Sequence, residues 1–325
     1  NIILGYNTAV GVDVNLEGVA KPDFSDIRFG DVNGVLYNYW LETYVIADKA
    51  TFWVKIPSIP AGASSIYIYY GNAMAVSVSN GYSTFDTFFE DFSGSVINTG
   101  RWTELDPKNA LRQSDRLNTY NLTPFWDSAL ISASTFSRSA GTTVYGKYTT
   151  LTSVTAPNHI MIGWENNQTT DPNYTQLVHG FYFNAGSASI CEKGVGYGAG
   201  VAYTTNTPYN FRVRLKATGA DYEIKGGAYS AWTNVYNGVG GSFTDATMRL
   251  AITQHTHSGY LSYLFIPKYA TTAPVISLVG AAEAWGSSMV TWNKGATLRI
   301  TNSNASVLNN YQVAFTVNTQ SLISS

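Results

Sequence analysis

The sequence predicts an all-β protein: a small β-sandwich, then a larger jelly roll, then a C-terminal tail of further strands. Apolar and polar residues alternate with period two in one short segment after another along the 325 residues, which is typical of half-buried strands. Charged residues make up only 12%, and the polarity comes instead from Asn, Ser, Thr, Gly and 23 Tyr. No stretch shows the spacing of an amphipathic helix. This composition is typical of an extracellular β protein.

We expect residues 1–78 to form an incomplete β-sandwich, one that lacks a strand. Two strands flank a turn at Asp31 to Gly34, and "TFWVKI" and "SIYIYYG" give two more, joined by a segment rich in Pro and Gly. The opening "NIIL" is too short for a convincing first strand. The first strand that we expect has four alternating apolar residues, Val10, Val12, Val14 and Leu16, and it would be the acceptor strand beside which an added strand pairs.

Residues 79–90 are expected to be a connector, and residues 91–284 to be the larger domain. Its strands include "TVYGKYTTL", "HIMIGWEN", "HGFYFNAG", "NFRVRLKA", "DYEIKGG", "TMRLAITQ" and "YLSYLFIPK". Short strands at regular spacing with turn signals between them favour a sandwich or jelly roll. Residues 285–325 then give a small-residue linker, "AWGSSM", and two strands.

The tail strands alternate like the others but have nothing after them to pack against. Six apolar positions recur at every second residue of the two strands: Leu298, Ile300, Tyr311, Val313, Phe315 and Val317. An unpaired strand with one apolar face must bury that face against another sheet. We therefore expect the two tail strands to complete a sandwich outside the tail itself.

Composition and charge exclude several classes of partner. The net charge of -2 gives no basic field for nucleic acid, and no run of 18 apolar residues predicts a membrane span. The single cysteine, Cys191, cannot form a disulfide within the chain.

Because the numbering starts at an Asn, we expect a processed end or the edge of a longer sequence. Four sequons favour a glycosylated surface protein, at Asn121, Asn167, Asn173 and Asn304.

Residues that could carry chemistry are few and scattered. The carboxylates Glu90, Asp91, Glu165 and Asp171 are isolated, without the close pair that a retaining glycosidase needs, so we expect no enzyme activity. No cofactor is expected, although Glu90 and Asp91 are weak candidates for structural calcium. His255 and His257 share a strand face as half of a metal site, or simply as surface residues. Four tryptophans could stack on sugars or fill the core: Trp102, Trp126, Trp164 and Trp232.

Several short motifs occur together in one order. "SDIRF", "YWLE", "FWVKIPSIPAG" and "IYIYYGN" resemble a domain of unknown function found in many secreted and surface proteins, especially archaeal ones. "FFEDFSG", "GRW" and "KYATTAPVISLVGAAE" resemble the concanavalin A-like, laminin-G-type jelly roll that often follows it. The resemblance covers residues 10–285. It implies that the first domain normally begins with strands like "ATLRITN" and "NYQVAFTVNT", which here stand at positions 292–319.

A domain that lacks strands and a tail that carries such strands together suggest donor-strand complementation, in which one subunit completes the next. The chain then resembles subunits of archaeal surface threads and bundling pili, and its partners would be copies of itself, head to tail. The tail could instead fold back and complete its own domain. The alternatives are a carbohydrate-binding or adhesive surface module, with surface glycans as partners, and a segment of a longer repeat protein.

Overall fold

The structure, a computed structural model, describes residues 2–7, 14–121, 124–151, 159–236, 243–278, 292 and 294–313. Its regular elements are almost all strands, and the helical elements in the described residues are α1 (Gly81–Thr84) and the 3-10 turn η1 (Tyr174–Gln176). The predicted all-β fold with two sandwiches is therefore confirmed. None of the helices in the described ranges has the length and apolar character that crossing a membrane requires.

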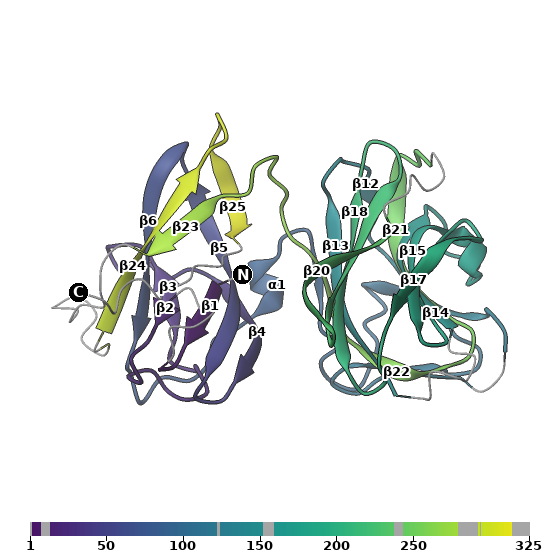
Figure 1. The fold of residues 1–325 in the computed structure, drawn as a ribbon, viewed down its shortest axis with the longest axis horizontal. Coiled ribbons are helices and arrows are strands. Elements are labelled where there is room, and N and C mark those ends of the chain that lie inside the picture. The colour runs from purple at the N-terminus through teal and green to yellow at the C-terminus, as the bar shows by residue number, and fades with distance from the viewer. Residues whose placement is uncertain are drawn as a thin grey trace. The chain divides into compact units, whose positions relative to one another are not determined.

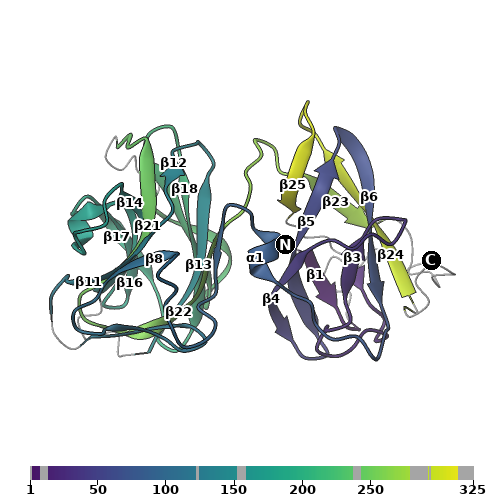
Figure 2. The same cartoon turned by 180° about the vertical axis from the view of Figure 1, so that it is seen from behind.

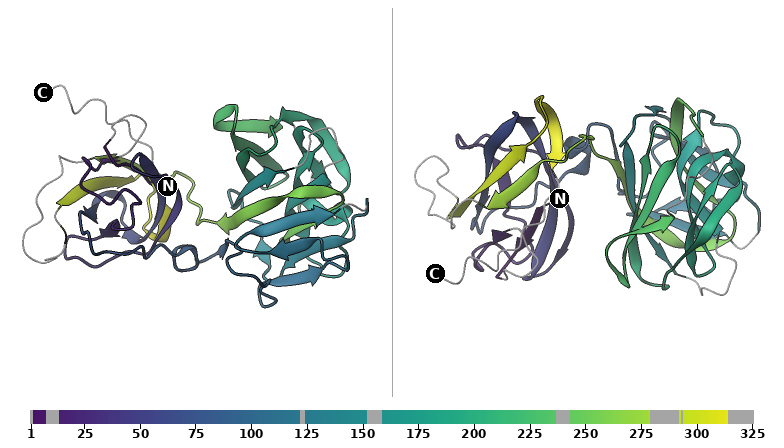
Figure 3. Two further views of the ribbon diagram at one scale, coloured as in Figure 1. Left: turned by 90° about the horizontal axis from the view of Figure 1, so that it is seen from below. Right: turned by 45° about the horizontal axis from the view of Figure 1, so that its top comes forward.

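The chain divides into two compact units. The terminal unit contains Asn1–Thr87 and Pro267–Ser325, and the central unit contains Phe88–Ile266. The terminal unit is thus built from both ends of the chain, so the C-terminal strands, yellow in Figure 1, lie among the purple N-terminal ones. The two further views in Figure 3 show the same interleaving.

Two sheets form the terminal unit. One has the order β2-β1-β5-β25, with β4 on the other side of β5, and the other has the order β23-β24-β6-β3. The first comprises β1 (Ile2–Gly5), β2 (Val14–Asn15), β4 (Tyr39–Val45), β5 (Lys49–Ile59) and β25 (Leu308–Val313). The second comprises β3 (Arg28–Gly30), β6 (Gly62–Tyr70), β23 (Val275–Leu278) and β24 (Lys294–Asn302). One buried cluster, which includes Phe29, Phe52, Ile68 and Leu298, joins the inner faces.

The tail strands complete the sandwich of their own chain, which corrects the expectation that they leave it. β24 pairs with β6 over its whole length, from Lys294–Tyr70 to Asn302–Gly62, and β25 pairs with β5. The predicted inward positions are buried: Leu298, Ile300 and Val313 at 0% exposure and Tyr311 at 8%. Phe315 and Val317 lie outside the described residues. The alternation correctly identified the buried face, but period two carries no information about which chain supplies the partner strand.

The predicted acceptor strand is also wrong. β24 and β25 pair with β6 and β5, whereas Val14 pairs with Leu4 in a short parallel bridge, and Leu16 is a buried core residue. Val10 and Val12 lie outside the described residues. The dismissed segment Ile2–Gly5 forms β1, antiparallel to β5. Four residues suffice there because β5 provides a ready edge and Leu4 is fully buried in the core.

The domain boundaries also differ from the expected ones, because a strand expected in the jelly roll pairs with the tail. Val275–Leu278, expected to close the jelly roll, pairs instead with β24 in the terminal unit. The supposed connector contains α1, capped by the Asn80 side chain, which accepts a hydrogen bond from Ser83 N at 2.9 Å. The expected turn at Asp31 to Gly34 is present, and Gly30 and Leu36 form an antiparallel bridge across it, but the strands on either side pair elsewhere, β3 with β6 and β4 with β5.

Two eight-stranded antiparallel sheets form the central unit, a jelly-roll-type sandwich. The β22 sheet has the order β20 (Tyr229–Tyr236), β19 (Ala220–Gly226), β18 (Pro208–Leu215), β13 (Thr143–Thr150), β22 (His257–Ile266), β10 (Leu117–Asn121) and β9 (Leu111–Gln113), with β7 (Phe88–Glu90) on β22. The β21 sheet has the order β17 (Val195–Ala202), β16 (Ser187–Glu192), β15 (Leu177–Asn184), β14 (His159–Asn166), β21 (Thr247–Gln254), β11 (Ser128–Ser132) and β8 (Trp102–Leu105), with β12 (Phe136–Ser137) on β21.

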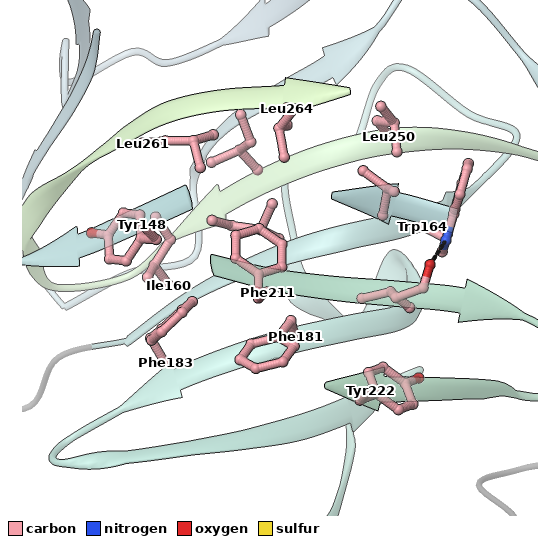
Figure 4. Packing of buried hydrophobic residues seen from close by; sticks show 14 of the residues in the cluster. Tyr148, Ile160, Trp164, Phe181, Phe183, Phe211, Tyr222, Leu250, Leu261 and Leu264 are labelled. Carbon is pink, nitrogen blue, oxygen red and sulfur yellow. Dashed lines mark hydrogen bonds between the residues drawn. The ribbon is translucent and has the colours of Figure 1, made fainter. Parts of the chain in front are cut away.

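Aromatic side chains fill the space between these sheets. Phe181 and Phe183 of β15 meet Phe211 of β18 at ring-centroid distances of 5.2 and 5.9 Å (Figure 4). The Trp164 indole donates to Val213 O across the core at 3.2 Å, so its polar atom is satisfied where the ring is fully buried.

Candidate functional site

The outer face of the β21 sheet carries a second apolar cluster besides the core. Residues that alternate with the core positions gather there: Ala129, Ile131, Met161, Leu177, Cys191 and Ala251. Half-buried Leu105, Trp126, Tyr174 and Tyr182 pack against them. Gly163 lies in the same layer, where an added Cβ would come within 2.1 Å of His179 O. A sheet face that is apolar on its outer side must be covered by another part of the protein or by a partner.

At one end of this face, five rings meet. We call Trp126, His159, Tyr174, Tyr182 and His255 the aromatic cluster. Trp126 lies 4.8 Å from the Tyr174 ring and 5.3 Å from His255. His159 lies 5.3 Å from His255 and 5.7 Å from Tyr182, with which it also shares a hydrogen bond through Nδ1 and the phenol hydroxyl. All five residues are half-buried rather than enclosed in the core.

Polar groups border the aromatic cluster. Asp127 Oδ2 accepts an ion-pair contact from Lys108 Nζ at 2.6 Å, while its Oδ1 is buried and has no hydrogen-bond partner among the described residues. Lys108 Nζ also lies 4.5 Å from the ring centroid of Phe125, which is 59% exposed. A buried carboxylate oxygen without a partner is costly, and a ligand donor would relieve that cost.

Both histidines of the aromatic cluster are neutral at pH 7. Burial lowers the pKa of His159, and the neighbouring His255 lowers it further. Burial also lowers the pKa of His255, against a smaller raising effect of Asp127. Neutral imidazoles present flat rings with one donor and one acceptor, which suits hydroxyl groups.

A loop, residues 167–173, lies against the same face. Thr253 Oγ1 donates to Pro172 O at 2.5 Å, and Gln168 contacts both Glu165 and Asp171. Glu165 is 1% exposed, and burial raises its pKa to about 8, so it is protonated at pH 7. Glu165 and Asp171, two of the four carboxylates considered as catalytic candidates, thus lie near one another, but Glu165 is enclosed by the loop rather than presented to a substrate.

The four candidate tryptophans divide evenly between core and surface. Trp102 and Trp164 are core residues at 1% and 0% exposure. Trp126 belongs to the aromatic cluster, and Trp232 lies on the outer face of the β22 sheet. There it stands 5.9 Å from Tyr145, with the Arg212 guanidinium 4.3 Å from its ring centroid. The sequence could not assign these roles, because a tryptophan in a strand faces either side with similar propensity.

The proposed metal residues have other roles in the described part of the chain. Glu90 is 3% exposed and accepts from Arg101 Nε and Trp102 Nε1, both at 3.1 Å, and from Phe92 N at 3.0 Å. Asp91 Oδ1 accepts from Ser93 N. His255 meets His159 rather than His257, whose side chain is not described. Within the described ranges, no three His, Cys, Asp or Glu residues come together as a metal site.

Sequence reasoning missed a buried polar network at the other end of the same sheet. His179 Nδ1 contacts Glu192 Oε1 at 2.8 Å, Tyr222 OH donates to the same oxygen at 2.5 Å, and Arg138 Nη2 lies 2.8 Å from His179 Nε2. His179, Glu192 and Tyr222 are all fully buried. No local signal marks them: His179 and Glu192 lie 13 residues apart on the paired strands β15 and β16, and Arg138 and Tyr222 come from parts of the chain about 40 residues away from His179. The mutual contacts and full burial make this network structural.

The sequons differ in accessibility. Asn167 is exposed, although its Oδ1 accepts from Arg249. Asn173 Oδ1 caps η1 through Thr175 N, and Asn304 Nδ2 donates to Thr272 O at 2.8 Å. Asn121 ends β10, and its side chain is not described. Asn167 is therefore the most accessible of the three described side chains.

Part of the chain matches a known sequence family. A model called "Domain of unknown function (DUF2341)" matches residues 23–105. The match runs from before β3 to the end of β8, less than a third of the chain, and so spans the boundary between the two units. The sequence matches none of the curated proteins with which it was compared.

Solved structures resemble the chain at low identity. The carbohydrate recognition domain of Emp46p, in a mutant form, has 9% identity and a TM-score of 0.37 over 55% of this chain and 97% of its own. The exoplasmic/lumenal domain of VIP36, bound to Ca2+ and Man3GlcNAc, has 7% identity and a TM-score of 0.39 over 57% and 86%. A xylan beta-1,4-xylosidase from Bacillus halodurans has 9% identity and a TM-score of 0.38 over 55%, and this chain spans only 39% of that protein.

Proposed function

We propose that the chain is a carbohydrate-binding module of an extracellular or cell-surface protein, and that the aromatic cluster is its sugar-binding surface. The observation that carries the proposal is the gathering of five half-buried aromatic residues beside a buried carboxylate oxygen that has no hydrogen-bond partner in the described part of the chain. Sugar rings present C–H groups that pack on aromatic faces, while their hydroxyls bond to a few fixed polar groups. Trp126 supplies the largest face, and Asp127 and the two neutral histidines supply hydroxyl partners.

Binding without hydrolysis is the expected activity. A retaining glycosidase holds two carboxyl groups about 5–5.5 Å apart at the substrate. Glu165 is enclosed by the loop at 1% exposure, and Asp127 is bound to Lys108. Neither carboxyl therefore forms an open catalytic pair.

The two surface tryptophans provide a matched test. Binding of the purified chain to a panel of neutral and acidic polysaccharides is measured by calorimetry, and then repeated with Trp126→Ala and Trp232→Ala. We expect Trp126→Ala to weaken binding at least tenfold and Trp232→Ala to leave it unchanged. Equal losses in both variants, or no binding by the unmodified chain, would refute the proposal.

A second candidate function is a structural subunit of an extracellular filament that assembles by strand exchange. One observation favours it. β23 and β24 are antiparallel neighbours, yet residues 279–293 connect them, whereas hairpins usually need two to five residues. That connection is long enough to carry β24 and β25 to another copy, or to a following repeat if the chain is part of a longer protein. Electron microscopy for ordered fibres tests it, and a protein that stays monomeric at all concentrations contradicts it.

A further inference from the structure

The outer face of the β22 sheet is rich in basic side chains, although the whole chain has a net charge of -2. Its strands β19, β18 and β13 pair in that order, with β18 beside β13 in Figure 2, and their core residues alternate with residues that face outward. Four of the outward residues on these strands are basic and two are acidic: Lys147, Arg212, Arg214 and Lys225, and Asp221 and Glu223. This part of the face is therefore positively charged.

Both acids are already paired with the arginines of β18. Arg212 donates through Nε and Nη2 to the two carboxylate oxygens of Glu223 at 2.6 and 2.8 Å, which is a bidentate pair. Arg214 Nη2 donates to Asp221 Oδ2 at 3.0 Å, and Lys216 also pairs with Asp221. The acids of β19 are therefore engaged by these groups and do not neutralise the lysines beside them.

The two lysines lie in the next row of the same face. Lys147 of β13 and Lys225 of β19 stand on either side of Asn210 of β18, so their backbones are about 10 Å apart. Within the described ranges, neither lysine forms an ion pair with an acid, because the neighbouring acids are held by arginines. Asn210 Oδ1 accepts from Tyr263 OH at 2.8 Å, and the Asn210 amide nitrogen is a further donor in this row. The row thus offers two cations with a neutral donor between them.

Two exposed arginines extend the positive charge toward the other edge of the sheet. Arg112 of β9 lies opposite Asn118 of β10, which lies opposite Tyr260 of β22. The Arg116 guanidinium lies 3.9 Å from the ring centroid of Tyr260, and its Nε donates to Asn118 Oδ1 at 2.9 Å. Asp115, the adjacent acid, accepts a hydrogen bond from a backbone N–H, that of residue 94, at 2.9 Å. We call Lys225, Lys147, Arg116 and Arg112 the basic stripe.

We propose that the basic stripe is a second binding surface, which holds an acidic polysaccharide through its sulfate or carboxylate groups. The proposal goes beyond the sugar-binding function proposed above, because the aromatic cluster lies on the outer face of the other sheet. Charge complementarity carries it: four cations cross the sheet from β19 to β9. Lysine is a compact charge on a flexible stem, so such a row accepts anionic groups that repeat along a polymer.

The surroundings of the stripe favour a polysaccharide over other anionic partners. Interfaces with proteins have a buried apolar core, and single-stranded nucleic acid needs ring faces on which its bases stack. The rings here are already in contact with neighbours: Tyr260 carries Arg116, and Tyr145 is stacked on Phe265 at 5.1 Å. The net charge of -2 gives no long-range attraction for duplex nucleic acid. A flexible anionic sugar chain needs only the point charges of the stripe.

Dextran sulfate and uncharged dextran test the stripe, because they are one polymer with and without anionic groups. Binding to the full chain is measured by calorimetry at about 50 mM and about 300 mM NaCl. All variants carry Trp126→Ala, so that the aromatic cluster contributes little. The test variant adds Lys147→Gln and Lys225→Gln. The matched control adds Lys49→Gln and Lys193→Gln, which remove the same charge from exposed positions outside the stripe.

We expect the chain to bind dextran sulfate but not dextran, with an affinity that falls steeply as the salt concentration rises. The test variant should lose about fivefold in affinity, and the control less than about twofold, because each exposed ion contact contributes modestly. Equal losses in the two variants, or equal binding of both polymers, would overturn the stripe. Tighter binding of duplex DNA than of dextran sulfate would overturn the choice of a polysaccharide. Neutral polysaccharides and the chain with an intact Trp126 report on the aromatic cluster separately, so failure of one site is distinguishable from failure of the other.

Discussion

The buried carboxyl of Glu165, beneath the loop over the β21 sheet, should make the free energy of unfolding depend on pH. The change is Glu165→Gln, which keeps the shape and the oxygen that Gln168 contacts but removes the ionisable group. Burial raises the pKa of Glu165 from 4.5 to about 8. The folded state therefore holds this proton more tightly than the unfolded state. Its stabilising contribution is complete below about pH 4.5 and is lost as the pH rises to about 8.

The size of the effect follows from the shift. One pKa unit corresponds to about 1.36 kcal/mol, so a shift of about 3.5 units gives an upper figure of about 5 kcal/mol between pH 4.5 and pH 8. The side chain is 1% exposed, so solvent screening is small. The Gln variant lacks this pH-dependent loss of stability. Its free energy of unfolding should therefore exceed that of the unmodified protein by near zero at pH 4.5 and by a few kcal/mol at pH 9.

Urea unfolding at pH 4.5, 7 and 9, followed by tryptophan fluorescence, measures this difference. Trp102 and Trp164 report on the core of the central unit. Asp115→Asn is the control, because Asp115 is exposed and its φ of 50° is one that Asn readily adopts. If the variant and the unmodified protein show the same dependence on pH, Glu165 does not titrate as its burial implies, and the enclosed-carboxyl argument fails.

Three further predictions concern stability. Leu298→Ala should lower the free energy of unfolding in urea by about 2–5 kcal/mol, because Leu298 is in the core of the terminal unit. Arg299→Ala, at the exposed neighbouring position, should lower it by almost nothing. Equal effects would contradict the pairing of β24 with β6. Gly163→Ala should cost about 1–3 kcal/mol because the new Cβ would meet His179 O, and an unchanged melting temperature would count against this packing. Burial lowers the pKa of His179 in the folded protein. Below about pH 6.5 the unfolded chain therefore takes up the proton more readily, and the free energy of unfolding should fall as the pH drops. His179→Gln should flatten this part of the pH profile, and an unchanged slope would refute the assignment.

Local sequence determined which segments form strands and which of their faces are buried. Period-two alternation at Leu298, Ile300, Tyr311 and Val313 predicted inward positions, and all four are buried. The same alternation predicted most strands of the central unit. These features depend on backbone geometry and side-chain polarity within a few residues, so they can be read without knowing the fold.

The partner of each strand was decided only by tertiary structure. β24 pairs with a strand more than 200 residues earlier, and four residues at the N-terminal end form a strand because β5 offers them an edge. The aromatic cluster gathers rings from residue 126 to residue 255 in the same way. Hydrogen bonds between strands join backbone groups that are alike in every residue, so the sequence of one strand specifies its buried face but not its neighbour.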